Sequence, residues 1–303
     1  MKTSTSKRLR WNVAIWLAAG LFMTSTAGMA SGPIMPDPKA EARHQPQVEE
    51  TANGIPLVNI TAPSSGGVSR NEYETFNVPD KGAILNNSYT LSKTELAGYV
   101  QGNNNMAERP AKIIVNEVTG AGSTSMDGFL EVAGNRADVV IANPNGITVN
   151  GGGFINTGKA FLTTGKPVYD GEDHLQRFDI TGGDILIEGK GLGGKETESL
   201  AILSRAVKIN AGIWAKDLHI TTGANTVDAK TLEASAIEGK GGRPAFALDT
   251  AAIGGMYAGR ITLVGTEKGL GVNNSGTWSA EDNLILDWNG DLKNSGTIYS
   301  KGN

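Results

Sequence analysis

A short repeat near the end of the chain limits the folds that this sequence can adopt. The motif Asn-Ser-Gly-Thr begins at Asn274 and again at Asn294, and the aliphatic run 284–286 lies between the two copies. A looser copy occupies residues 210–218. In a chain of short strands, a period near twenty residues is typical of one coil of a solenoid. One coil cannot bury its own apolar face, so the repeat predicts stacked coils that share a core.

The rest of the sequence has the texture of short β-strands separated by turns. Aliphatic and β-branched runs are cut by Gly, Asn, Asp and Pro, as at 57–60, 112–115 and 184–187. The 41 glycines are close to twice the share of an average soluble protein, which is about 7%. Helical spacing is scarce, and residues 196–207 are the one stretch where a short helix competes with a strand. We therefore predict an all-β chain.

The first thirty residues resemble a secretory signal. A positively charged start precedes the apolar stretch 13–23, and Gly28, Met29 and Ala30 offer a small-residue cleavage site. The apolar stretch is shorter than the roughly 20 residues that a membrane-spanning helix needs. We predict a signal peptide over residues 1–30 and export by the Sec machinery, with a short membrane anchor as the alternative.

Composition narrows the compartment and the partners. The chain has no cysteine, so an exported form would rely on core packing and backbone hydrogen bonds instead of disulfides. The absence of disulfides also suits a chain that crosses a second membrane unfolded. The net charge of -4 supplies no basic stripe of the kind that a phosphate backbone requires, so we expect no nucleic-acid partner.

No pattern in the sequence marks an enzyme, a metal site or a cofactor site. His44, His174 and His219 are far apart and form no His-Glu-x-x-His motif. A Gly-x-Ser-x-Gly elbow and a calcium-binding Gly-Gly-x-Gly-x-Asp series are both missing from the sequence. Residues 189–194 formally match the dinucleotide fingerprint Gly-x-Gly-x-x-Gly, but the surrounding chain lacks the alternation of strands and helices that this site needs. We interpret these glycines as a loop between coils.

Three tryptophans leave a choice open. Trp214, Trp278 and Trp288 are expected at exposed positions, where indole rings serve as ligand platforms or pack at the edges of coils. For a solenoid we favour packing at the coil edges.

Residues 142–147 contain a turn with well-defined chemistry. Pro144 presets φ at the second turn position, Asn143 can hydrogen-bond the turn backbone, and Gly146 suits the fourth position. Together with Asn145 and Ile147 these residues predict a tight turn between two strands. The turn by itself carries no function.

The surroundings of that turn resemble the secretion domain of two-partner secretion exoproteins, the family of filamentous haemagglutinins, haemolysins and contact-dependent inhibition proteins. The resemblance covers nearly everything after Asn53, and its matching stretches are 114–120, 128–134, 137–147, 150–157, 204–207, 248–249 and 254–261. The family's other signature, Asn-Pro-Asn-Leu, corresponds here to residues 103–106. In this chain Pro and Leu are replaced, so only the Asn pattern persists.

The resemblance implies a right-handed parallel β-helix with a small antiparallel cap at its N-terminal end. It also implies recognition in the periplasm by an outer-membrane transporter of the Omp85 type, followed by secretion or display on the cell surface, where a host or neighbouring cell would be the target. The candidate secretion-motif residues are Asn143, Pro144, Asn145, Gly146, Ile147, Asn103, Asn105 and Asn116. For the Asn143 turn, holding the cap in shape is favoured over direct contact with the transporter.

We divide the chain into a signal peptide (1–30), a flexible lead-in rich in proline (31–53), the secretion domain (54–265) and the start of haemagglutinin-type repeats (266–303). The sequence stops within a repeat, so we expect an N-terminal part of a longer protein whose activity lies beyond Asn303. Two alternatives remain: a polysaccharide-active β-helix such as a lyase, and a free-standing adhesin that ends at Asn303.

Overall fold

The computed structural model describes residues 32–106 and 109–302. The predicted signal peptide therefore lies outside the described residues. Within them, no helix has the length and apolar character needed to cross a membrane. The description below concerns the unit formed by residues 32–302.

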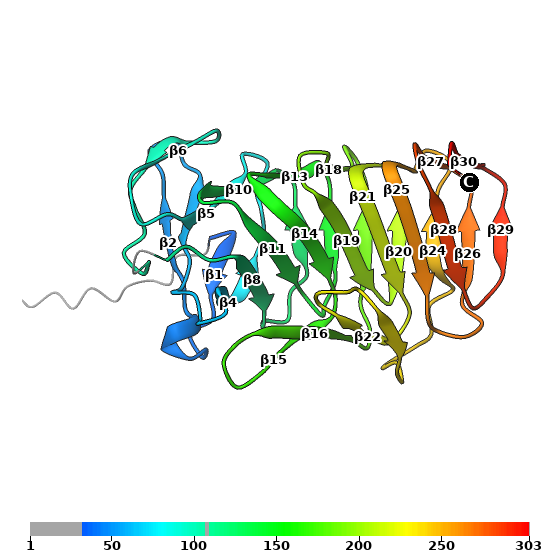
Figure 1. Ribbon diagram of the computed structural model, residues 1–303, viewed down its shortest axis with the longest axis horizontal. Helices are drawn as coiled ribbons and strands as arrows, with labels where there is room; N and C mark the ends of the chain where they lie inside the picture. Colours follow the sequence, from blue (N-terminus) through cyan, green and yellow to red (C-terminus); the bar gives the residue numbers. More distant parts are fainter. Residues whose placement is uncertain (1–31, 107–108, 303) are drawn as a thin grey trace, which may run out of the picture. The chain divides into compact units, whose positions relative to one another are not determined.

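Parallel strands stack into coils with three faces, and the coils follow one another along one axis (Figure 1). The first face contains β4 (Val68–Phe76), β8 (Ile113–Val118), β11 (Ala137–Ala142), β14 (Thr157–Thr163), β19 (Ser199–Ser204), parts of β21 (Gly212–Thr222) and β25 (Gly255–Gly265), and β28 (Leu284–Trp288). The second face contains β3 (Pro56–Asn59), β5 (Ala83–Asn87), β10 (Phe129–Gly134), β13 (Gly152–Ile155), β18 (Leu192–Gly194), the other parts of β21 and β25, β27 (Thr277–Ala280) and β30 (Thr297–Ser300). The third face contains β9 (Thr124–Met126), β12 (Ile147–Val149), β17 (Asp184–Ile187), β20 (Ala206–Ile209), β24 (Phe246–Thr250), β26 (Gly271–Asn274) and β29 (Leu292–Asn294).

Antiparallel strands close the N-terminal end of this parallel structure. The closing elements are β1 (Ile34–Pro36), which pairs with β4, β2 (Gln47–Glu50), which pairs with β3, and the hairpin of β6 (Ser92–Thr94) and β7 (Gly98–Val100). The predicted fold, a parallel β-helix with a small antiparallel N-terminal cap, is confirmed.

The expectation of a flexible lead-in over residues 31–53 is wrong for its described part. Besides β1 and β2, this segment forms the 3-10 helix η1 (Ala42–His44), and the side chains of Ile34 and His44 are buried. The physical reason is that the first coils would otherwise expose unpaired strand edges, and β1 and β2 satisfy those backbone groups. The prolines lie in and between these short elements without preventing them.

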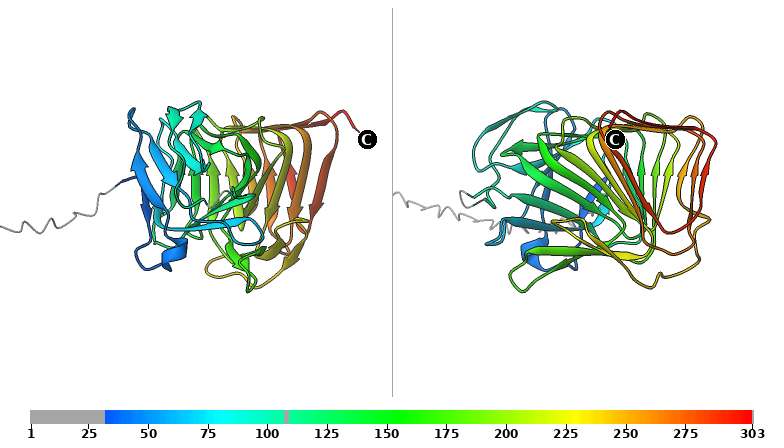
Figure 2. Two further views of the ribbon diagram at one scale, coloured as in Figure 1. Left: turned by 60° about the vertical axis from the view of Figure 1, so that its left-hand side comes forward. Right: turned by 45° about the vertical axis from the view of Figure 1, so that its right-hand side comes forward.

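A second, smaller sheet covers part of the first face from outside (Figure 2). It consists of the antiparallel strands β15 (Lys166–Tyr169), β16 (Leu175–Ile180), β22 (Asn225–Asp228) and β23 (Ala234–Ala236). A separate apolar cluster fills the space between the layers, where the rings of Phe161 and Phe178 lie with their centroids 6.0 Å apart.

This outer sheet explains why residues 196–207 gave a competing helix prediction. The segment forms β19 and β20 instead, so the helix alternative is wrong. Residues 200–204 are all buried because the coil interior covers one side of β19 and the outer sheet covers the other. Burial on both sides removes the alternation of apolar and polar residues that identifies a strand.

Inward-facing side chains stack from coil to coil in register. One such column runs through Leu192, Ile213, Met256, Trp278 and Ile298. Trp278 is fully buried in this column and its indole Nε1 donates a hydrogen bond to Thr250 Oγ1 at 3.0 Å. The expectation that Trp278 is exposed is therefore wrong.

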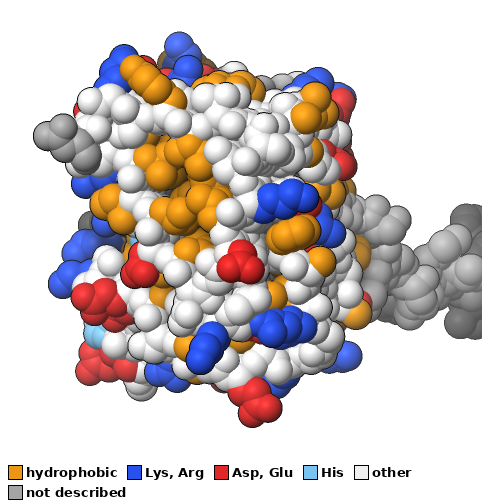
Figure 3. Space-filling view, turned by 90° about the vertical axis from the view of Figure 1, so that its right-hand side faces the viewer, with side chains coloured by type: hydrophobic (Ala, Val, Ile, Leu, Met, Phe, Trp, Pro, Cys, Tyr) orange, Lys and Arg blue, Asp and Glu red, His pale blue; other side chains and the backbone are white. Residues whose placement is uncertain are grey.

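The apolar column ends at the last described coil. Leu284, Leu286, Trp288 and Ile298 pack against the core but are only partly buried. The view onto this end shows hydrophobic side chains gathered at its centre (Figure 3).

Candidate functional site

The turn after β11 is held by side-chain amides. Asn143 is fully buried; its Oδ1 accepts a hydrogen bond from the backbone N–H of Asn145 at 2.9 Å, and its Nδ2 donates to Gly122 O at 2.9 Å. Asn145 Nδ2 donates to Gly120 O at 2.8 Å. Gly146 has a φ of 109°, which favours glycine. The turn therefore ties the β11–β12 connection to the loop that follows β8.

The turn at residues 103–106 has the same design despite its altered sequence. Asn103 Oδ1 accepts from the N–H of Asn105 at 2.9 Å, and Asn103 Nδ2 donates to Ile60 O at 2.8 Å and Asn86 O at 3.0 Å. Asn105 Nδ2 also donates to Ile60 O. The asparagines make these bonds without the family's proline, which is why the Asn pattern suffices for the shape.

Asn116, the remaining candidate, lies inside the coil on β8. It is fully buried, donates from Nδ2 to Val140 O at 3.1 Å, and accepts at Oδ1 from the hydroxyl of Tyr73 at 3.0 Å. A surface partner cannot reach it in this structure. Among the candidates, Pro144 and Asn145 are exposed, whereas Asn143, Gly146, Ile147, Asn103 and Asn116 are buried.

The structure does not bring the candidates together into one site. The Asn143 turn bonds to residues 120–124, and the Asn103 turn bonds to β3 and β5. No hydrogen bond between described residues joins the two turns. Each turn fixes a different connection of the coils.

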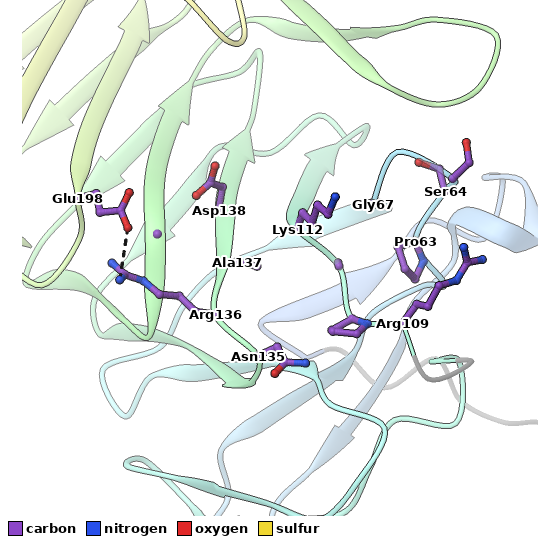
Figure 4. A pocket seen from close by; sticks show the side chains of 14 residues that line it. Pro63, Ser64, Gly67, Arg109, Lys112, Asn135, Arg136, Ala137, Asp138 and Glu198 are labelled. Carbon is purple, nitrogen blue, oxygen red and sulfur yellow. Dashed lines mark ion pairs between the residues drawn. The ribbon is translucent and has the colours of Figure 1, made fainter.

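A groove of about 680 Å³ lies next to the chain that follows the Asn103 turn (Figure 4). Arg109, Lys112 and Arg136 line it together with Asp138 and Glu198, and Arg136 forms an ion pair with Glu198 at 3.4 Å. Burial raises the pKa of Asp138, although the N–H of the next coil's residue 159 donates to its Oδ1 at 2.7 Å. This groove could not be predicted from sequence patterns, because its charged residues come from separate coils.

Two buried charged side chains anchor segments outside the coils, and neither was predicted. Glu131 accepts hydrogen bonds from the N–H groups of Glu95 at 2.7 Å and Leu96 at 2.9 Å, which holds the β6–β7 hairpin. Arg205 pairs with Glu267 at 3.0 Å. Glu131 interrupts the apolar sequence of β10, and Arg205 stands between the apolar strands β19 and β20; a charge at such a position is the signal that could have identified them.

An ionic cluster joins the N-terminal segment to the outer sheet. His44 Nδ1 lies 3.1 Å from Glu72, and Asp173 of the β15–β16 connection lies beside both Arg43 and His44. Burial lowers the pKa of His44, and the positive charge of Arg70 lowers it further. The negative charges of Glu72 and Asp173 act in the opposite direction and raise it.

This cluster predicts a dependence on pH. Because the folded-state pKa of His44 lies below its ordinary value of about 6.5, the folded protein binds fewer protons, and stability is lost as the pH falls below that value. Between about pH 7.5 and 5.5, urea titrations should show a larger loss of unfolding free energy for the wild type than for His44→Gln. Equal losses would show that His44 is not responsible.

None of the described residues forms a group of three or more His, Cys, Asp or Glu that could hold a metal ion. Residues 188–191 connect β17 to β18 without a helix, and Gly193 and Gly194 belong to β18 itself. A Cβ at Gly191 would lie 2.1 Å from Gly212 O, so this glycine permits the close stacking of coils.

Comparisons with known proteins agree with this geometry. A family model described as TPS secretion domain matches residues 33–298. Toxin CdiA of Yersinia pestis is 46% identical over 274 residues, which are 89% of this chain and 8% of that protein. The 16S rRNA endonuclease CdiA of Enterobacter cloacae subsp. cloacae is 44% identical over 276 residues, 90% of this chain and 8% of that protein.

A solved structure supports the same conclusion. The crystal structure of the filamentous hemagglutinin secretion domain superposes with a TM-score of 0.75 at 31% identity, and the match covers 89% of this chain and 95% of that one. The chain thus spans nearly the whole of that secretion domain, but only about 8% of the length of the two CdiA proteins.

Proposed function

The chain belongs to the family of two-partner secretion (TPS) domains, and from this premise we propose that an outer-membrane transporter of the Omp85 type recognises it in the periplasm. The observation that carries the proposal is the family match over residues 33–298, which includes the cap as well as the coils. The family is one of proteins that are secreted or displayed on the cell surface of bacteria with an outer membrane. We propose the same destination here, reached after Sec export directed by residues 1–30.

Strand pairing is the recognition mode that we propose. β2 pairs with β3 along one edge, and no strand of the described residues pairs with its other edge. A periplasmic module of the transporter could add a strand there through main-chain hydrogen bonds. Hydrogen exchange on the complex with those modules should show slower exchange for residues 47–50. Unchanged exchange at β2, with protection elsewhere, would assign recognition to another surface.

The Asn143 turn supports this function by maintaining shape. Asn143→Ala removes a buried amide that bonds to Gly122 O, to Thr124 Oγ1 and to the N–H of Asn145, and this loss costs about 1–3 kcal/mol of unfolding free energy. We expect the secreted fraction to fall together with stability, as measured by comparing culture medium with cell extract in cells that carry the transporter.

Pro144→Ala is the matched control, because Pro144 is exposed at the tip of the same turn. It should leave stability and secretion nearly unchanged. If Pro144→Ala blocks secretion of a stable protein, the turn acts by direct contact instead. Normal secretion of Asn143→Ala would remove the turn from the secretion machinery altogether.

We propose that this region serves export and that the biological activity resides in the rest of a longer protein. Relatives are named as toxins and nucleases, but the chain covers about 8% of their length. The family match extends to residue 298, and we propose that residues 266–303 also begin the series of haemagglutinin-type coils. Coils that emerge outside could fold by stacking on those already formed. Release of unsaturated products from anionic polysaccharides by the purified chain would favour the lyase alternative.

A further inference from the structure

A row of aromatic side chains follows the outside of the second face. Strand register aligns seven outward positions, one on each successive strand: Phe129, Gly153, Gly193, Trp214, Tyr257, Ser279 and Tyr299. Phe129, Tyr257 and Tyr299 are 45%, 39% and 49% exposed. The rings of Trp214 and Tyr257 are nearly parallel, with an interplanar angle of 16° and centroids 6.1 Å apart. Aromatic rings are thus presented to solvent in a fixed order.

Glycines hold these rings against the sheet. A Cβ at Gly153 would lie 2.4 Å from the ring of Phe129, and a Cβ at Gly212 would lie 2.4 Å from the indole of Trp214. Tyr257 covers Gly255 in the same way, with its nearest atom at 2.8 Å from the Cβ position. The rings therefore occupy the space that side chains would need. This packing restricts their motion and lowers the entropy that binding would cost.

A slot of about 290 Å³ separates the first two aromatic residues of the row. Phe129, Phe154 and Trp214 line it together with Gly193, which lies between Phe129 and Trp214 in the strand register. Lys195 and Glu196 stand at its rim; both are exposed, and neither forms an ion pair with another described residue. This volume is close to the lower limit for pockets that bind small ligands, about 300 Å³, and it suits a single ring.

The chemistry of the slot favours one class of ligand. The exposed surfaces of the Phe129 and Trp214 rings can stack on a ligand, while an ammonium and a carboxylate at the rim offer a hydrogen-bond donor and an acceptor. One positive and one negative charge leave the rim without net charge, which disfavours a polyanion. A flat ring with apolar faces and hydroxyl groups at its edge satisfies both features, and this is the chemistry of an uncharged pyranose sugar.

A polypeptide partner fits the row less well. The aromatic row is one residue wide and is interrupted by Gly153, Gly193 and Ser279. The next outward residues, two positions after Trp214 and Ser279, are Lys216 and Glu281, and both are exposed. A stable protein interface buries about 1,600 Å² around a contiguous apolar centre, and this row provides no such centre.

We propose that the slot between Phe129 and Trp214 binds one ring of an uncharged glycan, and that Tyr257 and Tyr299 extend the platform for further rings of the same chain. This binding goes beyond the secretion function and does not depend on it.

Calorimetric titration of the purified chain with cellohexaose, chitohexaose and maltohexaose tests the proposal. At least one of these should bind with a dissociation constant of about 1 mM or tighter. Trp214→Ala should weaken that binding by about tenfold, the effect of losing one aromatic contact. Gly193→Val should abolish it, because the new Cβ meets no atom closer than 3.7 Å and the methyl groups then fill the slot.

Thr148→Val is the control, since it places the same side chain at a half-buried outward position of β12 on the third face, away from the aromatic row. It should bind as the wild type does. Failure of all three sugars to bind at millimolar concentration would overturn the proposal, as would wild-type binding by Gly193→Val. Displacement of the bound sugar by a neutral peptide would reassign the slot to a polypeptide and would also overturn it. Secretion of Gly193→Val should stay normal, so this result is separate from the transporter proposal.

Discussion

Replacing Arg205 by alanine is expected to lower the free energy of unfolding by about 3 kcal/mol, the largest loss that we predict for a polar residue. The guanidinium is buried and bonds through Nε and Nη2 to the two carboxylate oxygens of Glu267, each at 3.0 Å. Its Nη1 also donates to Lys240 O at 2.7 Å. The hydrogen bond from Arg205 lowers the pKa of Glu267, so the substitution leaves a charged carboxylate that keeps only the N–H of Ala224 at 3.1 Å and the more distant Arg243 at 3.9 Å.

The same substitution should expose the connection between β23 and β24. Arg205 holds this connection through Lys240, and the ends of the guanidinium lie against Gly239. Limited trypsin digestion should therefore cut after Lys240 sooner in Arg205→Ala than in the wild type, and urea titration should measure the loss of stability.

Arg260→Ala provides the control, because Arg260 pairs with Asp217 at 3.1 Å on the surface. A surface pair of this kind contributes about 1 kcal/mol or less. If both variants lose the same small amount of stability, the buried pair does not hold the outer segment in the way that we infer.

Gly276→Ala is expected to disrupt the last coils, with a loss of about 3 kcal/mol. A Cβ at Gly276 would lie 2.1 Å from Gly254 O and 2.6 Å from Ala251 O, both in the preceding coil. A Cβ at Gly296 would lie 2.1 Å from Gly276 O, so the same contact repeats one coil later. The backbones of neighbouring coils cannot move apart here without breaking the strand pairing. A single added methyl group is therefore enough to disrupt the last coils.

Gly193→Ala is the matched control for this prediction, since its Cβ would have no neighbour closer than 3.7 Å. Thermal unfolding should show a much lower midpoint for Gly276→Ala than for Gly193→Ala. Hydrogen exchange should locate the damage in β27 and β30. Similar midpoints for the two variants would mean that the coils can separate slightly at this corner at little cost.

The close contact at Gly276 also gives the physical reason for the repeat. Asn274 Oδ1 accepts a hydrogen bond from the N–H of Gly276 at 3.1 Å, and Asn274 Nδ2 donates to Asn294 Oδ1 at 2.9 Å. Asparagine and glycine recur twenty residues apart because each coil presents the same corner to the next. The period could therefore be read from the sequence without knowledge of neighbouring segments.

Predictions that depended on local chemistry were confirmed where the chain forms regular coils. The strand character of 57–60, 112–115 and 184–187 agrees with β3, β8 and β17. The turn at residues 143–146 forms, with Asn143 bonding to the turn backbone as its side-chain chemistry indicates. Its role in secretion remains a prediction, because shape and recognition are separate properties of the same residues.

The sequence by itself determined the all-β class, the coil repeat and the resemblance to TPS domains, because these depend on residue types at short spacings. Only the tertiary structure decided which surfaces are covered: the cap orders residues 32–53, the outer sheet buries both sides of β19, and Trp278 faces inward. The tertiary structure also decided the aromatic row and the groove at Arg136, because both bring together residues from coils far apart in sequence. Their positions follow from strand register, which depends on the hydrophobic pattern of each strand and on the length of each connection.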